Sequence, residues 1–258
     1  MNTIQSLSWD EISFLAKLRL FSKSREQEKE KIRSNNPQIQ AEGYTSLSGT
    51  YYGITSTAFF QLKASFQSGW LTPAKVTLWG ITWLPLGMCC YWRMLPLSNK
   101  VVELVGYDGM SADQCDIRQS ILRHRGSNTE RMECCKAGLS KSPQKAHTRG
   151  LLYVGLAEAR LSEFLELRYS GEINSPTAEA IKLKAERAVR LALRAAEEAE
   201  SQEPLQTSRI LRRCAFVIEE LENGETEEGG FLLHEAERVL EEAGLAAEDK
   251  RLIQLYCS

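Results

Sequence analysis

The side chains that most often carry catalysis are few and scattered in this sequence of 258 residues. The histidines are His124, His147 and His234, far apart and each in a polar or charged stretch. A nucleophile and its base, a phosphate-binding loop or a metal-binding helix would leave a short motif, and none of GxGxxG, GxxxxGK[S/T], GxSxG or HExxH occurs. The sequence therefore predicts a non-catalytic protein without a cofactor, with an enzyme of unrecognised site as the less favoured alternative.

The cysteines do not form a metal-binding or disulfide pattern. There is no CxxC, and the total of seven is odd. The adjacent Cys134 and Cys135 are of a type that binds soft metals or carries a lipid, but no further ligand follows at a suitable spacing. We predict no metal site and a reducing compartment.

The pattern of charged side chains predicts contacts within the protein or with lipid, and it does not indicate catalysis or nucleic-acid binding. The carboxylate pairs at 197–198, 219–220 and 241–242 are predicted to lie on exposed helix faces. A basic cluster precedes the C-terminal part, but acidic residues interrupt it and no aromatics interleave with it, so nucleic-acid binding is not favoured. We expect the cluster to meet anionic lipid or the acidic C-terminal part of the same chain. Its members are Arg118, Arg123, Arg125, Arg131, Lys136, Lys141, Lys145 and Arg149.

The elements that would position these side chains divide into two unlike parts. The formal charge is +7 for residues 1–150 and -9 for residues 151–258, and all five tryptophans precede residue 93. We predict a boundary near 140–150. An N-terminal region (1–96) and a polar connection with a short helix (97–146) would then precede an acidic all-helical domain (147–258).

The segment 73–95 is the main candidate for a membrane-spanning helix. No charge occurs between Lys75 and Arg93, and Thr72–Pro73 is a natural helix start. At the membrane interfaces we expect Trp70, Lys75, Tyr91, Trp92 and Arg93. Gly80 and Gly87 would face one side and allow a second helix to approach. The alternative is a buried core helix, or two short segments divided at Pro85.

Other N-terminal elements follow from capping and composition. We predict a helix over 8–33, packed on the protein or lying on a membrane surface, and irregular structure over 42–69 with a short helix at 56–67. A strand or loop is expected at 101–106 and a helix at 111–125, whereas 126–149 shows no period. Gly and Pro punctuation predicts C-terminal helices at 148–170, 176–201, 205–222, 227–244 and 246–256.

Small residues recur on one face of two of these helices. Ala185, Ala188, Ala192 and Ala195 are spaced by three and four, and Ala236 and Ala243 flank Leu240. Such a face lets helices pack closely. The stretches 185–192 and 236–243 resemble the second helix of a tetratricopeptide repeat, which implies stacked helical hairpins. The usual pattern of the preceding helix is missing, so a plain antiparallel bundle is the alternative.

These features together predict a mainly α protein with one transmembrane helix and a C-terminal bundle or repeat-like hairpins. The expected function is an accessory subunit, assembly factor or scaffold of an organellar membrane complex, with a mitochondrial location favoured. Its partners would be other protein subunits, bound through the C-terminal helices, and membrane lipid. The alternative is a soluble, cytoplasmic helical adaptor.

Overall fold

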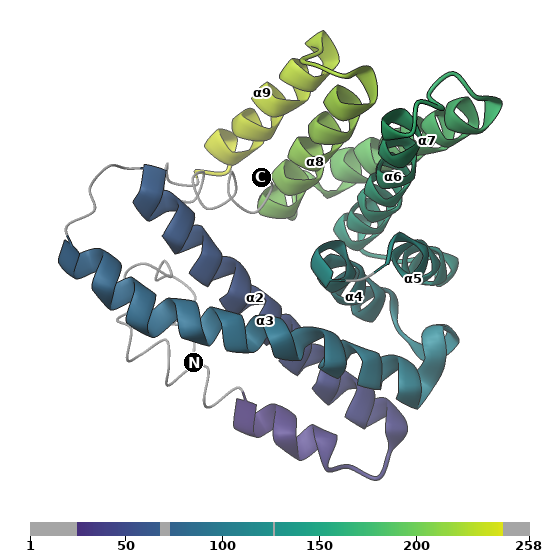
Figure 1. Cartoon of the computed structure of the whole chain (residues 1–258). Helices are drawn as coiled ribbons and strands as arrows, with labels where there is room; N and C mark the ends of the chain where they lie inside the picture. The colour runs from purple at the N-terminus through teal and green to yellow at the C-terminus, as the bar shows by residue number, and fades with distance from the viewer. Residues whose placement is uncertain (1–24, 68–72, 126, 245–258) are drawn as a thin grey trace.

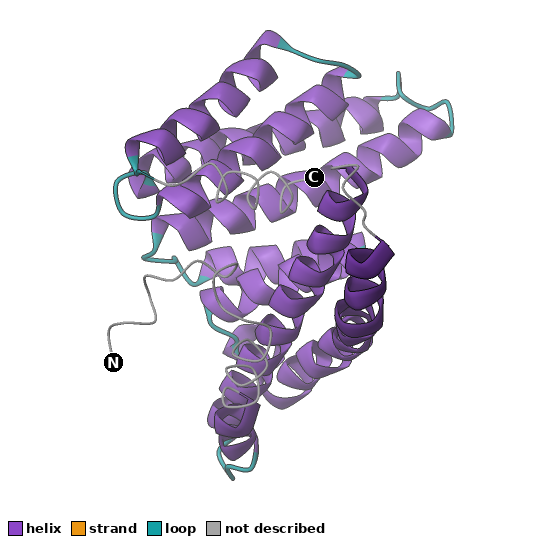
Figure 2. Ribbon diagram, turned by 90° about the vertical axis from the view of Figure 1, so that its left-hand side faces the viewer, coloured by secondary structure: helices purple, strands orange, loops and turns teal. Residues whose placement is uncertain are grey.

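The computed structural model describes residues 25–67, 73–125 and 127–244, and every regular element in these ranges is a helix (Figure 2). The predicted mainly α class is therefore confirmed. A helical stretch over 25–32 is followed by the labelled helices. They are α2 (Pro37–Gln67), α3 (Pro73–Gly109), α4 (Ala112–Arg125), α5 (Asn128–Ser140), α6 (Ala146–Tyr169), α7 (Pro176–Ala199), α8 (Pro204–Glu222) and α9 (Glu227–Glu242).

The helices pack as antiparallel pairs: α2 with α3, α4 with α5, α6 with α7, and α8 with α9. The first helices of the last three pairs also contact one another in succession, α4 with α6 and α6 with α8. Figure 1 shows α4 and α5 between the long α2/α3 pair and the C-terminal pairs. The architecture is thus a row of helical hairpins with a longer hairpin at one end.

In the C-terminal half, capping residues set the ends of the helices where the sequence predicts them. Ser175 and Thr226 are N-caps whose hydroxyls accept hydrogen bonds from the backbone N–H groups of Ala178 and Gly229. Asn223 ends α8 in the left-handed conformation with φ 64°. The observed bounds of α6 to α9 lie within two residues of those expected. The predicted helix at 246–256 lies outside the described residues.

The expectation of irregular structure after residue 42 is wrong, because α2 is a continuous helix through Gln67, which includes the short helix expected at 56–67. Residues 68 and 69 lie outside the described residues. The Ser and Thr side chains of α2 satisfy themselves inside the helix: the hydroxyls of Thr45, Ser48 and Thr50 donate to backbone carbonyls three or four residues earlier.

Small residues on α2 allow other elements to approach. A Cβ at Gly43 would lie 2.9 Å from Lys31 Cβ. A Cβ at Gly49 would lie 3.5 Å from Ile117 Cδ1 of α4. Local turn-forming tendency is outweighed by these contacts and by the pairing with α3.

Two further predictions in this half are corrected. Residues 101–106 are helical and belong to α3, which continues to Gly109 across a non-helical Gly106. The stretch 126–149 contains α5, whose buried side is made of Arg131, Cys134, Cys135 and Gly138 with Met132. That side has almost no ordinary core residues, so no apolar period marks it in the sequence.

The transmembrane prediction for 73–95 is also corrected. The segment is helical, but none of the helices in the described residues is both long and apolar enough to cross a membrane. The uncharged run covers only 76–92, and Thr77, Gly80, Thr82 and Gly87 dilute it.

The small-residue faces lie in the core of the C-terminal pairs. Ala185, Ala188, Ala192 and Ala195 of α7 are buried, as is Ala236 of α9. Ala243 instead caps the C-terminus of α9 and is exposed. The domain boundary expected near 140–150 stays a prediction. Helix α6, which follows it, belongs to both sides: Leu151 packs in the C-terminal core, and Leu152 packs in a cluster formed with α3, α4 and α5.

Gly138 provides a test of the close packing among α4, α5 and α6. A Cβ atom there would lie 2.8 Å from Leu152 Cδ1 and 2.9 Å from Cys115 Cβ. Because Cys115 Cβ is fixed to the α4 backbone, Gly138→Ala should lower the free energy of unfolding by about 1–3 kcal/mol. Urea denaturation followed by circular dichroism measures this.

Gly230→Ala is the matched control, since a Cβ at this exposed position of α9 meets nothing within 4 Å. It should stabilise the protein by roughly 0.5–1 kcal/mol, because alanine costs less backbone entropy than glycine in a helix. Equal effects of the two substitutions would contradict the close approach.

Candidate functional site

Glu158 of α6 is the centre of a buried ion cluster that joins four helices. Arg213 of α8 donates two hydrogen bonds to it, from Nε to Oε1 and from Nη2 to Oε2, each at 2.8 Å. Arg131 of α5 also donates to Oε2 through Nη2, and Arg123 Nε of α4 lies 3.4 Å from the same oxygen. The carboxylate therefore holds residues from three successive hairpins.

The charges of this cluster do not balance. Three guanidinium groups surround one carboxylate, and the side chains of Arg131, Glu158 and Arg213 are no more than 5% exposed. Burial acts to raise the pKa of Glu158, but Arg213, Arg131 and Arg123 outweigh it and hold that pKa far below its ordinary range. Glu158 therefore stays ionised near neutral pH and is not suited to act as a general acid or base.

The cluster continues through an amide. Arg131 Nη2 donates to Gln119 Oε1 at 3.4 Å, and Gln119 Nε2 donates to Asp116 Oδ1 at 2.9 Å. Burial raises the pKa of Asp116 above its ordinary value, although Gln119 and the arginines oppose this. Together with Glu158, these groups form a polar layer between α4, α5, α6 and α8.

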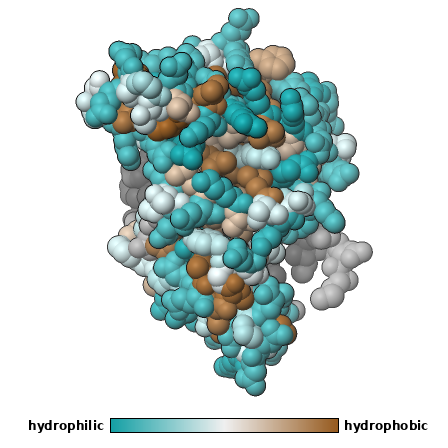
Figure 3. Space-filling model, turned by 90° about the vertical axis from the view of Figure 1, so that its right-hand side faces the viewer, coloured by the Kyte–Doolittle hydropathy of each residue, from teal (hydrophilic) through white to brown (hydrophobic). Residues whose placement is uncertain are grey.

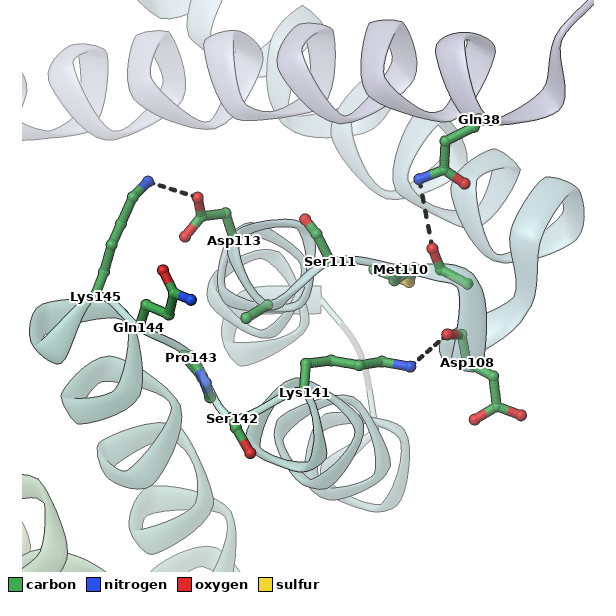
Figure 4. Close-up of a pocket in the computed structure, with 12 residues that line it drawn as sticks. Gln38, Asp108, Met110, Ser111, Asp113, Lys141, Ser142, Pro143, Gln144 and Lys145 are labelled. Atoms are coloured by element: carbon green, nitrogen blue, oxygen red, sulfur yellow. Dashed lines mark hydrogen bonds and ion pairs between the residues drawn. The ribbon is translucent and has the colours of Figure 1, made fainter.

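A pocket of about 510 Å³ lies where the ends of five helices meet (Figure 4). It is bounded by the start of α2, the end of α3, the start of α4, and the α5–α6 connection. Its lining residues are Gln38, 108–113 and 141–145.

Two charged side chains of the pocket lining form an ion pair. Lys145 Nζ lies 2.7 Å from Asp113 Oδ2, and Thr148 Oγ1 donates to Asp113 Oδ1 at 2.8 Å. Partial burial acts to raise the pKa of Asp113, but the bonds from Lys145 and Thr148 prevail and lower it. Lys141 Nζ donates to the Asp108 carbonyl. Lys145 is the N-cap of α6, and its side chain makes no capping hydrogen bond. Asp113 supplies a carboxylate close to this helix N-terminus, where a negative charge is favourable.

The cysteines lie mainly in helix contacts. Cys134 Sγ donates to the Cys115 carbonyl at 3.2 Å, and both residues are fully buried, as are Cys135 and Cys214. Burial raises the pKa of Cys135 to about 12, so its thiol stays protonated. In the described part of the chain, no group of three or more His, Cys, Asp and Glu side chains is placed to hold a metal ion.

Of the residues expected at membrane interfaces, Tyr91, Trp92 and Arg93 have side chains that the structure describes. Trp70 lies outside the described residues, while Lys75 and Gly80 are on α3 at positions where only the backbone is described. Tyr91 contacts α4 by donating its hydroxyl to the His124 carbonyl at 3.3 Å, whereas Trp92 and Arg93 are exposed. Gly87 is buried, and its carbonyl accepts a hydrogen bond from Thr55 of α2 at 3.2 Å.

Several arginines of the predicted basic cluster make contacts within the chain. Arg123 and Arg131 reach Glu158, and Arg149 pairs with Glu198 of α7, so part of the cluster does meet the acidic C-terminal part. Arg118 donates to Ser98 and Asn99 of α3, at 2.9 and 3.0 Å.

Sequence reasoning missed Glu158 and Arg213. The signal for Glu158 is its place in an apolar stripe of α6, since it lies four residues after Val154 and three before Leu161. A carboxylate at such a position needs a buried cation as partner. The sequence alone does not identify that partner, because Arg213 is 55 residues away.

Comparison of the chain with protein-family models, with curated proteins and with solved structures finds no match.

Glu158→Gln should destabilise the protein strongly. The neutral amide would leave three buried or half-buried guanidiniums without a counter-charge, and breaking such a buried pair costs about 3–5 kcal/mol. Chemical denaturation gives the free energy of unfolding. The control is Glu163→Gln, also on α6, whose partner Arg160 is nearer the surface; it should cost at most about 1 kcal/mol.

The Glu158 carboxylate should also make the free energy of unfolding depend on pH. Because the pKa of Glu158 is lower in the folded than in the unfolded chain, its contribution is present above the unfolded pKa and is lost as pH falls. The free energy of unfolding should decline from about pH 5 downward, and the decline should be shallower in Glu158→Gln. Parallel profiles for the two proteins would contradict this role.

Proposed function

We propose that this chain is a non-catalytic helical scaffold that binds other proteins through its C-terminal hairpins. The observation that supports it best is the succession of α4, α6 and α8, each the first helix of an antiparallel pair and each packed on the next. Stacked hairpins of this kind, as in tetratricopeptide-like repeats, bury a continuous core and leave one face of each first helix for ligands. The alanine positions of α7 and α9 are consistent with such repeats, apart from the exposed Ala243.

The exposed face of α8 is the proposed contact. Leu205 and Phe216 are each 43% exposed and eleven residues apart, which places them on one side of the helix. We call Leu205 and Phe216 the α8 face. Its two exposed apolar side chains suit the apolar side of an amphipathic partner helix.

The face of the molecule drawn in Figure 3 is mostly hydrophilic, with several apolar areas on it. Isolated apolar side chains on such a surface are ordinary, whereas a pair on one helix side offers anchors for a partner. We therefore assign the chain the role of an accessory subunit or assembly factor of a larger complex.

Phe216→Glu tests this function. The full-length protein and the variant are used as affinity baits in mild detergent, and co-purifying proteins are quantified by mass spectrometry. Loss of a hydrophobic anchor and introduction of a charge should reduce a specific set of partners by roughly tenfold or more.

Phe231→Glu is the control, because Phe231 is 63% exposed on α9 but is not part of the α8 face. It should retain the partners of the wild type. The proposal fails if both variants recover the same proteins as the wild type in equal amounts.

A further inference from the structure

The α2/α3 hairpin carries an exposed apolar helix face that the proposed scaffold function does not use. On the side of α3 toward α2, Cys90 and Met94 are buried with Leu47 and Tyr51. The opposite side turns outward at intervals of three and four residues. We call it the outer face of α3; it consists of Pro85, Met88, Cys89, Trp92 and Pro96, all exposed.

This face is apolar where a water-exposed helix is normally polar. Trp92 is 60% exposed and Met88, one turn earlier, is 39% exposed. The face becomes polar only after Pro96, at the exposed Asn99 and Lys100. A Trp and a Met that share one side of a helix form a contiguous patch of the kind that marks an interaction site.

The charge around the face is positive as far as Lys100, whose ammonium pairs with Glu103 of the next turn. Residues 43–102 contain no Asp or Glu, and their charged residues are Lys63, Lys75, Arg93 and Lys100. Arg93 is exposed directly beside Trp92. A stretch that covers most of two long helices without one acidic residue is suited to an anionic surface.

An anionic lipid surface fits these features better than a protein does. The basic residues are spread along both helices instead of being gathered beside Trp92, which matches a uniformly charged plane more than a few discrete carboxylates. An indole ring with an adjacent arginine is suited to the headgroup layer, where the ring is partly buried and the cation meets phosphate. The outer face spans residues 85–96, which at 1.5 Å per residue gives a shallow contact about 17 Å long.

We propose that the outer face of α3 binds the surface of an anionic lipid bilayer, with α3 lying along the surface and not crossing it. Trp92 and Met88 enter the headgroup layer, and Arg93 contacts anionic headgroups. The contact is independent of the α8 face, so lipid binding and partner binding can fail separately.

Vesicle sedimentation of the full-length protein tests this inference. The vesicles contain either phosphatidylcholine alone or phosphatidylcholine mixed with phosphatidylserine. The wild type should pellet with the mixed vesicles, much less with phosphatidylcholine alone, and less at high salt. Trp92→Glu should weaken partitioning by about tenfold or more, since it removes apolar area and adds a repelled charge.

Phe231→Glu is the matched control: it changes an exposed aromatic to glutamate on α9, outside both proposed faces, and should pellet like the wild type. Circular dichroism checks that both variants keep the wild-type helix content. The inference is overturned if the wild type does not pellet with phosphatidylserine vesicles, if Trp92→Glu pellets equally well, or if Trp92→Glu loses a protein partner while lipid binding is unchanged.

Discussion

The buried carboxylate of Glu158 is the interaction on which the arrangement of the hairpins depends. A lone charge inside a protein is costly, and here one carboxylate is shared by guanidiniums from α4, α5 and α8. All three arginines contact Oε2, so none of these helices can move away without leaving a buried charge without its partner. The cluster thus favours one relative placement of three hairpins that apolar packing alone would specify less sharply.

The long α2/α3 hairpin is joined to this stack by weaker and more numerous polar contacts. Arg118 of α4 reaches Ser98 and Asn99 near the end of α3, and Gln114 Nε2 donates to Thr45 of α2 at 3.3 Å. These contacts leave the outer face of α3 and the α8 face on separate elements. A scaffold that holds a partner at one element and a lipid surface at another would bring the partner to the membrane, and this combination connects the two proposals.

The sequence predicted best what local chemistry decides. Caps and breaks such as Ser175–Pro176 and Asn223 determine where the C-terminal helices begin and end, and these bounds were found with small errors. It failed where tertiary contacts decide: α2 is rich in Gly, Ser and Thr but forms a continuous helix paired with α3, and the buried side of α5 contains Arg131, two cysteines and Gly138. The capping box from Ser127 to Glu130 was the available signal for α5.

The membrane prediction rested on the aromatic, uncharged stretch of α3. That stretch contains too many small and polar residues for any helix of the described residues to be apolar enough to cross a membrane. Glu158 was visible only as a polar residue in an apolar stripe, because its three partners come from other helices.

Native-state hydrogen exchange resolved by mass spectrometry tests the coupling of the hairpins most directly. If the Glu158 cluster joins α4, α5, α6 and α8 into one cooperative unit, the protected amides of these helices should exchange with a common opening free energy in the wild type. In Glu158→Gln, α8 and α9 should open at a lower free energy than α4 and α5. Separate opening of α8 in the wild type, or an unchanged common value in the variant, would contradict the account.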